Sequence, residues 1–221
     1  MPTDRRTERV KSLLSLRQPD LRVVLEGVAI AHNASAVIRT CDAAGILHLD
    51  LVSPNPDLLG INKAISTRAE KWLDIHIHES LEACLLPLKD RGFRVAVTHL
   101  GQDAVEYTEL DYSLPLALVF GSESEGVSPQ ALKLADHRIR IPMLGMVQSL
   151  NLSVSVGVIL FEALKQRRAK GFYDRRRLGD EEFERYLREW LSGEEEKGNP
   201  ERAKKRGLPL RAGPLRNGDK S

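Results

Sequence analysis

Short apolar runs alternate with segments of helical spacing from Leu21 to about Gly145, and this alternation constrains the fold more than any other feature of the chain. It is typical of a mostly parallel β-sheet covered by helices. We therefore expect an α/β fold. The expected strands are 21–28, 46–54, 72–78, 93–100, 116–121 and 137–143.

Helices are expected between these strands, at 33–44, 80–92 and 128–136. Asn33 is well suited to cap the first, Pro87 weakens the second, and Pro129 takes the first helical position of the third. The apolar stretch Leu150–Leu164, whose polar members are small, predicts a further helix buried on most sides. Its cover is either its own sheet or a second subunit, so an oligomer follows as a hypothesis.

The 221 residues suit one buried core rather than two. We expect residues 1–20 to form a basic N-terminal helical extension and 21–170 to form the core domain. Residues 171–191 are expected to form a C-terminal helical extension, and 192–221 a charged tail that is mobile without a partner.

No stretch approaches the roughly 20 apolar residues that a membrane helix needs, and the N-terminal segment lacks the apolar run of a secretory signal. The chain is therefore expected to be cytoplasmic, with no membrane partner. Cys41 and Cys84 stand far apart without Cys or His neighbours at ligand spacing, so neither a zinc site nor a disulfide framework is indicated. Both are expected to be buried thiols.

The net charge of +2 hides a strong segregation of charge along the chain. Residues 1–22 hold six basic and three acidic side chains, and residues 165–177 and 202–221 each hold seven and one. Residues 23–164 instead hold ten and seventeen. Clustered Lys and Arg suit a polyanion such as a nucleic acid, and the alternative is solvated helix faces with a disordered basic tail.

Three segments carry unusual loop chemistry: HNASAVIRTCDAAG from His32, FGSESEGVS from Phe120 and IPMLGMVQSLNLSVS from Ile141. Neither GxGxxG nor GxxxxGK[ST] is present, so a conventional phosphate loop is not indicated. Two of the segments follow late strands. The functional site is therefore expected in the C-terminal half.

In order and separation, these segments resemble the three signature motifs of the SPOUT methyltransferases, and GMVQSLNLSVS resembles the branch that methylates guanosine 18 of tRNA on the ribose 2′-oxygen. The likeness covers residues 8–175. It implies a deep C-terminal trefoil knot, a homodimer, and an enzyme that uses S-adenosylmethionine to methylate tRNA. A knot is an exception to the usual unthreaded path of a chain.

Judged alone, Arg39 reads as a surface arginine, and Ser149 and Asn151 read as helix-capping residues. The resemblance instead assigns catalysis to Arg39, beside the target ribose and its phosphate. A guanidinium does not readily lose a proton, so we expect Arg39 to hold the phosphate and stabilise charge on the attacking oxygen, without a metal. The other catalytic residues that the resemblance implies are Asn33, Glu123, Ser149 and Asn151.

The resemblance also implies that the methyl donor is bound, largely through backbone groups, by Thr98, Leu100, Gly121, Ile141, Met146 and Leu150. Gly121 and Gly145 suit such a place, because glycine lets the main chain approach a ligand closely. The expected RNA-binding residues supply affinity rather than base identity. They are Arg5, Arg6, Arg9, Lys11, His32, Arg167, Arg168, Arg175, Arg176 and Arg177.

Two departures from the family pattern bear on the substrate. Ile30 and Ala31 stand where relatives carry a Lys-Pro pair, and STRAEKW replaces a Gly/Ser-rich segment. Two alternatives therefore stay open: a ribosomal RNA 2′-O-methyltransferase of the same fold, and a non-catalytic RNA-binding protein that keeps the knot.

Overall fold

The computed structural model describes residues 3–27, 30–54, 69–195 and 211–212. Within these ranges, the side chains of 30–34, 69–70, 193–195 and 211–212 are not described. Most of the charged tail expected at 192–221, and the first three residues of STRAEKW, therefore lie outside the described residues.

All strand pairs of the sheet are parallel, in the order β5-β7-β4-β6-β1-β2-β3-β8. The six expected strands are present, which confirms the α/β fold with a mostly parallel sheet. The two-residue strands β5 and β8 were not expected. The strands are β1 (Gln18–Glu26), β2 (Ile46–Val52), β3 (Asp74–His78), β4 (Arg94–Thr98), β5 (Val105–Glu106), β6 (Leu116–Phe120), β7 (His137–Arg140) and β8 (Arg211–Ala212).

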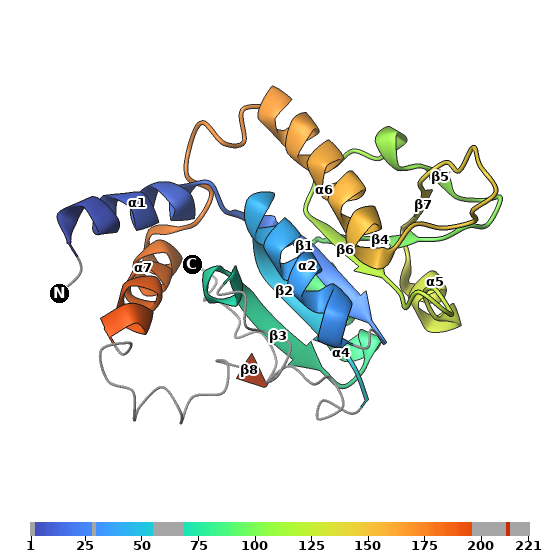
Figure 1. Ribbon diagram of the computed structural model, residues 1–221, viewed down its shortest axis with the longest axis horizontal. Coiled ribbons are helices and arrows are strands. Elements are labelled where there is room, and N and C mark those ends of the chain that lie inside the picture. Colours follow the sequence, from blue (N-terminus) through green and yellow to red (C-terminus); the bar gives the residue numbers. More distant parts are fainter. Residues whose placement is uncertain (1–2, 28–29, 55–68, 196–210, 213–221) are drawn as a thin grey trace.

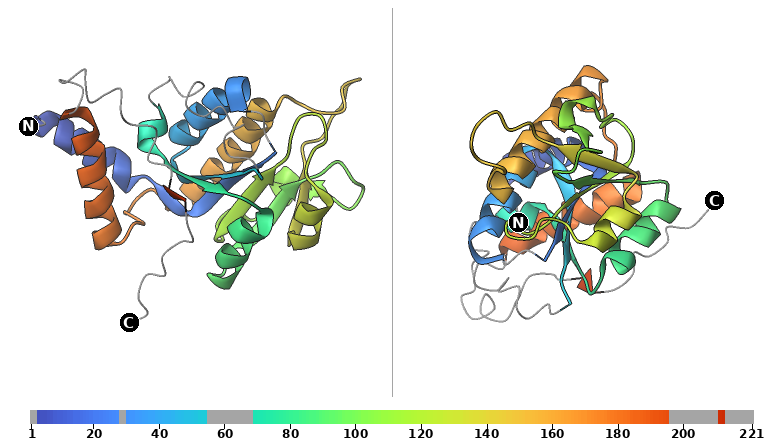
Figure 2. Two further views of the ribbon diagram at one scale, coloured as in Figure 1. Left: turned by 90° about the horizontal axis from the view of Figure 1, so that it is seen from below. Right: turned by 90° about the vertical axis from the view of Figure 1, so that its right-hand side faces the viewer.

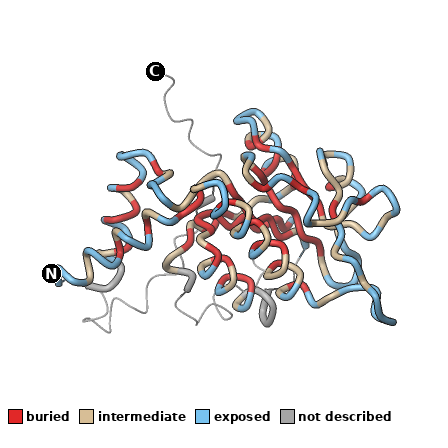
Figure 3. The backbone as a smooth tube through the Cα atoms, turned by 90° about the horizontal axis from the view of Figure 1, so that it is seen from above, coloured by how far each residue is buried: buried red, intermediate tan, exposed pale blue. Residues whose placement is uncertain are grey.

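Helices cover both faces of this sheet (Figures 1 and 2). On one face lie α2 (Ile30–Ala43) and α6 (Leu152–Ala169), which pack against each other. On the other face lie α4 (Leu81–Asp90) and α5 (Pro129–Leu134). Figure 3 shows the buried positions concentrated along the strands that these helices enclose.

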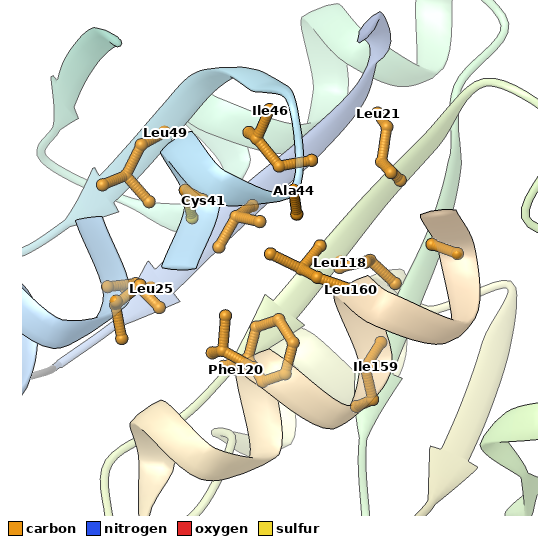
Figure 4. Packing of buried hydrophobic residues seen from close by; sticks show 14 of the residues in the cluster. Leu21, Leu25, Cys41, Ala44, Ile46, Leu49, Leu118, Phe120, Ile159 and Leu160 are labelled. Atoms are coloured by element: carbon orange, nitrogen blue, oxygen red, sulfur yellow. The ribbon is translucent and has the colours of Figure 1, made fainter. Parts of the chain in front are cut away.

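The core under α2 and α6 depends on alternate residues of the central strands. Leu118 of β6 packs with Cys41 of α2 and Leu160 of α6 (Figure 4). Both Cys41 and Cys84 are buried free thiols, as expected. Burial raises the pKa of the Cys41 thiol to about 12, so this thiol is protonated at neutral pH.

The start of α2 differs from the expectation. The helix begins at Ile30, so Asn33 lies inside it and does not cap it. Pro129 takes the first helical position of α5, as expected, behind the capping Ser128. Ser80 caps α4, which was not predicted: its Oγ accepts a hydrogen bond from the Ala83 amide. None of the helices in the described part of the chain could span a membrane.

The helices α1 (Asp4–Ser15) and α7 (Asp180–Glu195) pack side by side at one end of the molecule (Figure 1). Their contact buries apolar side chains that repeat at helical spacing. The 3₁₀ helix η2 (Ala69–Trp72) joins them through Trp72, whose ring meets Trp190 edge-on at 5.3 Å. The apolar side chains of the contact include Val10, Leu14, Phe183, Tyr186, Leu187 and Trp190.

Arg167 corrects one expectation about RNA binding. Its side chain is fully buried, and its guanidinium donates to Gln18 Oε1 at 3.0 Å and to Asp20 Oδ1 at 2.6 Å. It also donates to the backbone carbonyls of Tyr112 and Leu114. A guanidinium that serves these four acceptors inside the protein cannot reach a phosphate, so Arg167 holds the end of α6 against β1 and is not an RNA contact.

Replacing Arg167 by Met is expected to lower the free energy of unfolding by about 3 kcal/mol, because it leaves the buried Gln18 side chain and the carbonyls of Tyr112 and Leu114 without their donor. The matched control is Arg168→Met at the exposed next position, which is expected to change stability by no more than about 0.5 kcal/mol. Urea denaturation followed by tryptophan fluorescence measures both. Equal losses in the two variants would contradict the assigned role.

Candidate active site

Three of the residues expected to bind a ligand stand at neighbouring strand ends. The strands β7, β4 and β6 are adjacent and parallel, so their carboxyl ends meet at one edge of the sheet. Thr98 is the last residue of β4, Gly121 follows β6, and Ile141 follows β7. The backbone amide of His99 donates to the Ile139 carbonyl at 2.9 Å and holds two of these ends together. This edge is where an open parallel sheet binds ligands.

The loop after β6 closes on itself immediately beyond the strand. Ser122 and Gly126 exchange backbone hydrogen bonds of 3.1 and 2.9 Å. A Cβ atom on Gly121 would lie 1.9 Å from the Gly126 carbonyl oxygen. Glycine is thus required at position 121 by the loop's own backbone, whereas the expected reason was approach to a ligand. A Cβ on Gly145 would meet nothing within 4 Å.

Glu123 joins two of the three motif segments. Its Oε1 accepts a hydrogen bond from Asn151 Nδ2 at 2.6 Å and another from the Leu152 amide at 3.2 Å. Asn151 also caps α6, since its Oδ1 accepts from the Ser153 amide at 2.9 Å. A carboxylate at a helix N-terminus is further favoured by the helix dipole. Asn151 is therefore a helix cap, as its residue type alone indicated, and the same side chain also contacts Glu123.

Arg39 lies exposed on α2, the helix that packs against α6. Among the described residues, Arg39 makes no hydrogen bond or ion pair with Glu123. Ser149 is exposed in the loop before α6. The side chains of His32 and Asn33 lie outside those described, although their backbone is helical. Within the described residues, one chain thus brings Glu123 and Asn151 into contact, and no hydrogen bond or ion pair links Arg39 to Glu123.

The segment between β7 and α6 presents apolar side chains to solvent. Met146, expected to bind the donor, is fully exposed, and Leu150 is half-buried. Leu100, in the loop after β4, is 63% exposed. Leu144 and Val147 in the same segment are exposed as well, and so are Val154 and Phe161 on α6. Several exposed apolar side chains within one short segment are typical of a binding surface.

Several of the expected RNA-binding arginines surround one cavity of about 930 Å³ between α1 and the C-terminal end of α6. Sequence reasoning missed Trp72 and Tyr173, which also line it. Arg17 lines it too, but its side chain is buried and donates to Asp42 and to the Ile46 carbonyl, so it is held within the protein. Arginine beside aromatic rings is a recurring arrangement in nucleic-acid binding, but the arginines of α1 and Trp72 are too far apart in sequence for it to be recognised. The arginines expected from the sequence are Arg5, Arg6, Arg9 and Arg168.

Three of the remaining expected RNA-binding residues already have partners within the protein. Lys11 pairs with Glu8 at 2.9 Å, Arg176 pairs with Asp180, and Arg177 pairs with Asp20 at 2.6 Å. Arg175 is exposed. Exposed ion pairs are weak, so the pairs of Lys11 and Arg176 leave both side chains available to a phosphate.

Comparison with known proteins identifies related sequences and folds. The profile of the SpoU rRNA Methylase family matches residues 20–161. The chain is 48% identical over 189 residues to a tRNA (guanosine(18)-2'-O)-methyltransferase of Thermus thermophilus, which covers 86% of this chain and 97% of that protein.

Solved structures agree with this. The crystal structure of the Aquifex aeolicus TrmH/SpoU tRNA modifying enzyme superposes with a TM-score of 0.80 at 41% identity, covering 86% of this chain and 96% of that one. An AdoMet-bound rRNA methyltransferase from Sinorhizobium meliloti superposes with a TM-score of 0.58 at 29% identity, covering 72% and 60% of the two chains.

The contact at Gly121 generates a stability prediction. The Gly121→Ala variant is expected to lose about 1–3 kcal/mol of unfolding free energy, because its Cβ would overlap the backbone of Gly126. Gly145→Ala is the control, since open space surrounds that position. Thermal and urea unfolding of both variants test this, and a Gly121→Ala protein as stable as Gly145→Ala would show that the loop is not constrained as described.

Proposed function

The chain belongs to the SpoU rRNA Methylase family, and we propose that it transfers the methyl group of S-adenosylmethionine to the ribose 2′-hydroxyl of guanosine 18 in tRNA. The observation that carries this proposal is the 48% identity to a tRNA (guanosine(18)-2'-O)-methyltransferase over 97% of that protein's length. The matched region spans almost the whole relative, not an isolated motif.

The proposed donor site is the sheet edge where β7, β4 and β6 end. Backbone groups at Thr98, Gly121 and Ile141 would hold the adenosine, and the segment from Met146 to Leu150 would close over it. Support comes from the neighbouring positions of these strand ends and from the exposed apolar side chains of the loop, which lack a partner in the described chain alone. The related AdoMet-bound rRNA methyltransferase uses the same donor.

In the proposed reaction, the 2′-oxygen attacks the sulfonium methyl in line, the sulfur–carbon bond breaks, and S-adenosylhomocysteine leaves. The hydroxyl proton passes to the adjacent phosphate or to water. Arg39 would grip that phosphate and stabilise the charge that develops on the oxygen. Alignment supplies much of the acceleration, and the transfer needs no metal.

Glu123 would act as a positioning residue in this reaction. Its hydrogen bonds to Asn151 and Leu152 fix the loop after β6 to the start of α6. Ser149 and Leu150 lie directly before that junction, so fixing Asn151 also fixes the segment proposed to cover the donor.

We also propose that the active form is a homodimer. Val154 and Phe161 lie on the face of α6 that its own sheet leaves uncovered, and Met146 and Val147 in the preceding segment are also exposed. Because Arg39 makes no hydrogen bond or ion pair with Glu123 within the described residues of one chain, the arginine of one subunit would serve the donor bound in the other. The relation to knotted family members further suggests a trefoil knot in the segment after β7, and the tRNA substrate suggests a cytoplasmic location.

Two alternatives differ in substrate or chemistry. A ribosomal RNA methyltransferase is the first, because the Sinorhizobium meliloti relative carries that description, although its identity is only 29%. A non-catalytic RNA-binding protein is the second. Arg39, Glu123 and Asn151 together favour an enzyme, since a protein that only binds RNA would not need this set.

Methyl transfer from labelled S-adenosylmethionine to unmodified tRNA, with the modified nucleotide mapped, tests the proposal. Label is expected on the ribose of guanosine 18, and Arg39→Ala is expected to lower the rate about 100-fold or more while donor binding persists. Arg91→Ala, at the opposite edge of the sheet, is the matched control and should retain full activity. Label on ribosomal RNA alone would favour the first alternative, and no label on either RNA the second.

A single charge on α6 tests the dimer. Phe161→Glu places a carboxylate on the half-exposed apolar face, so the variant is expected to sediment as a monomer and to lose methyl transfer. The control is Leu86→Glu, which changes a side chain of similar exposure on α4. Analytical ultracentrifugation of both distinguishes them, and a Phe161→Glu protein that remains dimeric would place the interface elsewhere.

A further inference from the structure

Buried polar side chains line the face of β2 and β3 that points away from α2 and α6. Along a strand, side chains alternate between the two faces of the sheet. Leu49 and Ile75 therefore enter the core under α2 and α6. Their neighbours His48, Asp74 and His76 point to the opposite face, where the proposed methyl-transfer chemistry has no residues.

These three side chains converge on a small volume. The parallel register places His48 opposite Asp74. Asp74 Oδ2 lies 3.4 Å from His48 Nδ1 and 3.1 Å from His76 Nε2. Only 8% of His48 and 6% of His76 is exposed.

The two ring nitrogens are buried and unpartnered. Neither His48 Nδ1 nor His76 Nε2 has a hydrogen-bond partner among the described residues, although both lie close to the carboxylate oxygen. Their directions therefore do not suit hydrogen bonding to Asp74, and buried polar atoms left in this way call for a missing partner. The nitrogens and the oxygen all lie within 4.8 Å of one another.

We propose that His48, Asp74 and His76 bind one transition-metal ion of the Zn²⁺ type, which ties β2 to β3. Two imidazoles and a carboxylate are a ligand set that zinc accepts. With bonds of about 2.0–2.2 Å, two ligands of a tetrahedral ion lie about 3.3–3.5 Å apart. The separations of 3.1 and 3.4 Å already approach this spacing.

Tyr186 connects this site to α7. Its hydroxyl donates a hydrogen bond to Asp74 Oδ2, the same oxygen that the ion would use. Outer hydrogen bonds of this kind orient metal ligands. The ion would therefore stabilise the packing of the α1 and α7 pair against the sheet, which is a structural role that does not depend on the proposed methyl transfer.

A second group beside it, formed by Asp50, His78 and Cys84, is less suitable. Asp50 is already held by Arg22 through two hydrogen bonds of 2.8 Å, and His78 Nε2 lies 2.9 Å from Asp50 Oδ1. The Asp50 carboxylate thus already has hydrogen-bond partners, and the Arg22 guanidinium neutralises its charge.

The absence of a metal was expected because the two cysteines lack ligand spacing and because methyl transfer needs none. Neither reason applies to His48, Asp74 and His76. Their ligand atoms come from two strands. Within β3, the ligands Asp74 and His76 are two residues apart, and any half-buried strand with polar residues on one face has this spacing.

The test uses tag-free full-length protein, stripped with a chelator and titrated with Zn²⁺ against a chromophoric competitor. One equivalent is expected to bind per chain, and His48→Gln and His76→Gln are expected to lose this binding. His78→Gln is the matched control, since the same change on the same strand and face removes no ligand. The proposal is overturned if the native chain binds no better than His76→Gln, or if His78→Gln loses binding equally.

Two further measurements keep the test independent of folding defects. Co²⁺ bound to the native protein is expected to give the visible absorption of a tetrahedral site with nitrogen and oxygen ligands. Tyr186→Phe, which removes only the hydroxyl beside Asp74, is expected to weaken Zn²⁺ binding about 10-fold. A six-coordinate cobalt spectrum, or unchanged affinity in Tyr186→Phe, would contradict the site as described.

Discussion

The parallel direction of the strands is the constraint on which the rest of the molecule depends. Because β7, β4 and β6 run the same way and are adjacent, Ile141, Thr98 and Gly121 reach one edge of the sheet from distant parts of the sequence. A parallel sheet also needs helices on both faces. Helix α2, which carries Arg39, covers one face, and α4 covers the other. The proposed catalytic site is a consequence of this strand order and direction.

Helix α6 is held at both ends by buried or capping polar contacts. At its start, Glu123 binds Asn151 and the Leu152 amide, and at its end Arg167 binds Asp20 and the carbonyls that precede β6. Fixing both ends orients the whole helix, so its uncovered face with Phe161 is presented in a defined direction. A rigid surface of this kind suits the proposed second subunit. It also suits the proposal that Arg39 of one subunit acts on the donor bound in the other.

Much of this could be predicted from local pattern. The long strands β1 and β2 are mainly apolar segments, and Pro129 marks the start of α5. The burial of Arg167 could not be predicted, because a run of arginines in a sequence indicates a solvent-exposed surface. Only the tertiary fold brings Gln18 and Asp20 to Arg167. His48 and Asp74 were missed for the same reason, since only strand register brings them together.

The most direct test of the central claim uses a tRNA that carries a single 2′-deoxyguanosine at the position corresponding to guanosine 18 of the relatives' substrate. If the ribose 2′-oxygen accepts the methyl group, transfer to this tRNA falls to background while the matched all-ribose tRNA is methylated. Methylation that continues on the deoxy substrate would place the acceptor on a base or at another nucleotide, and would contradict the account.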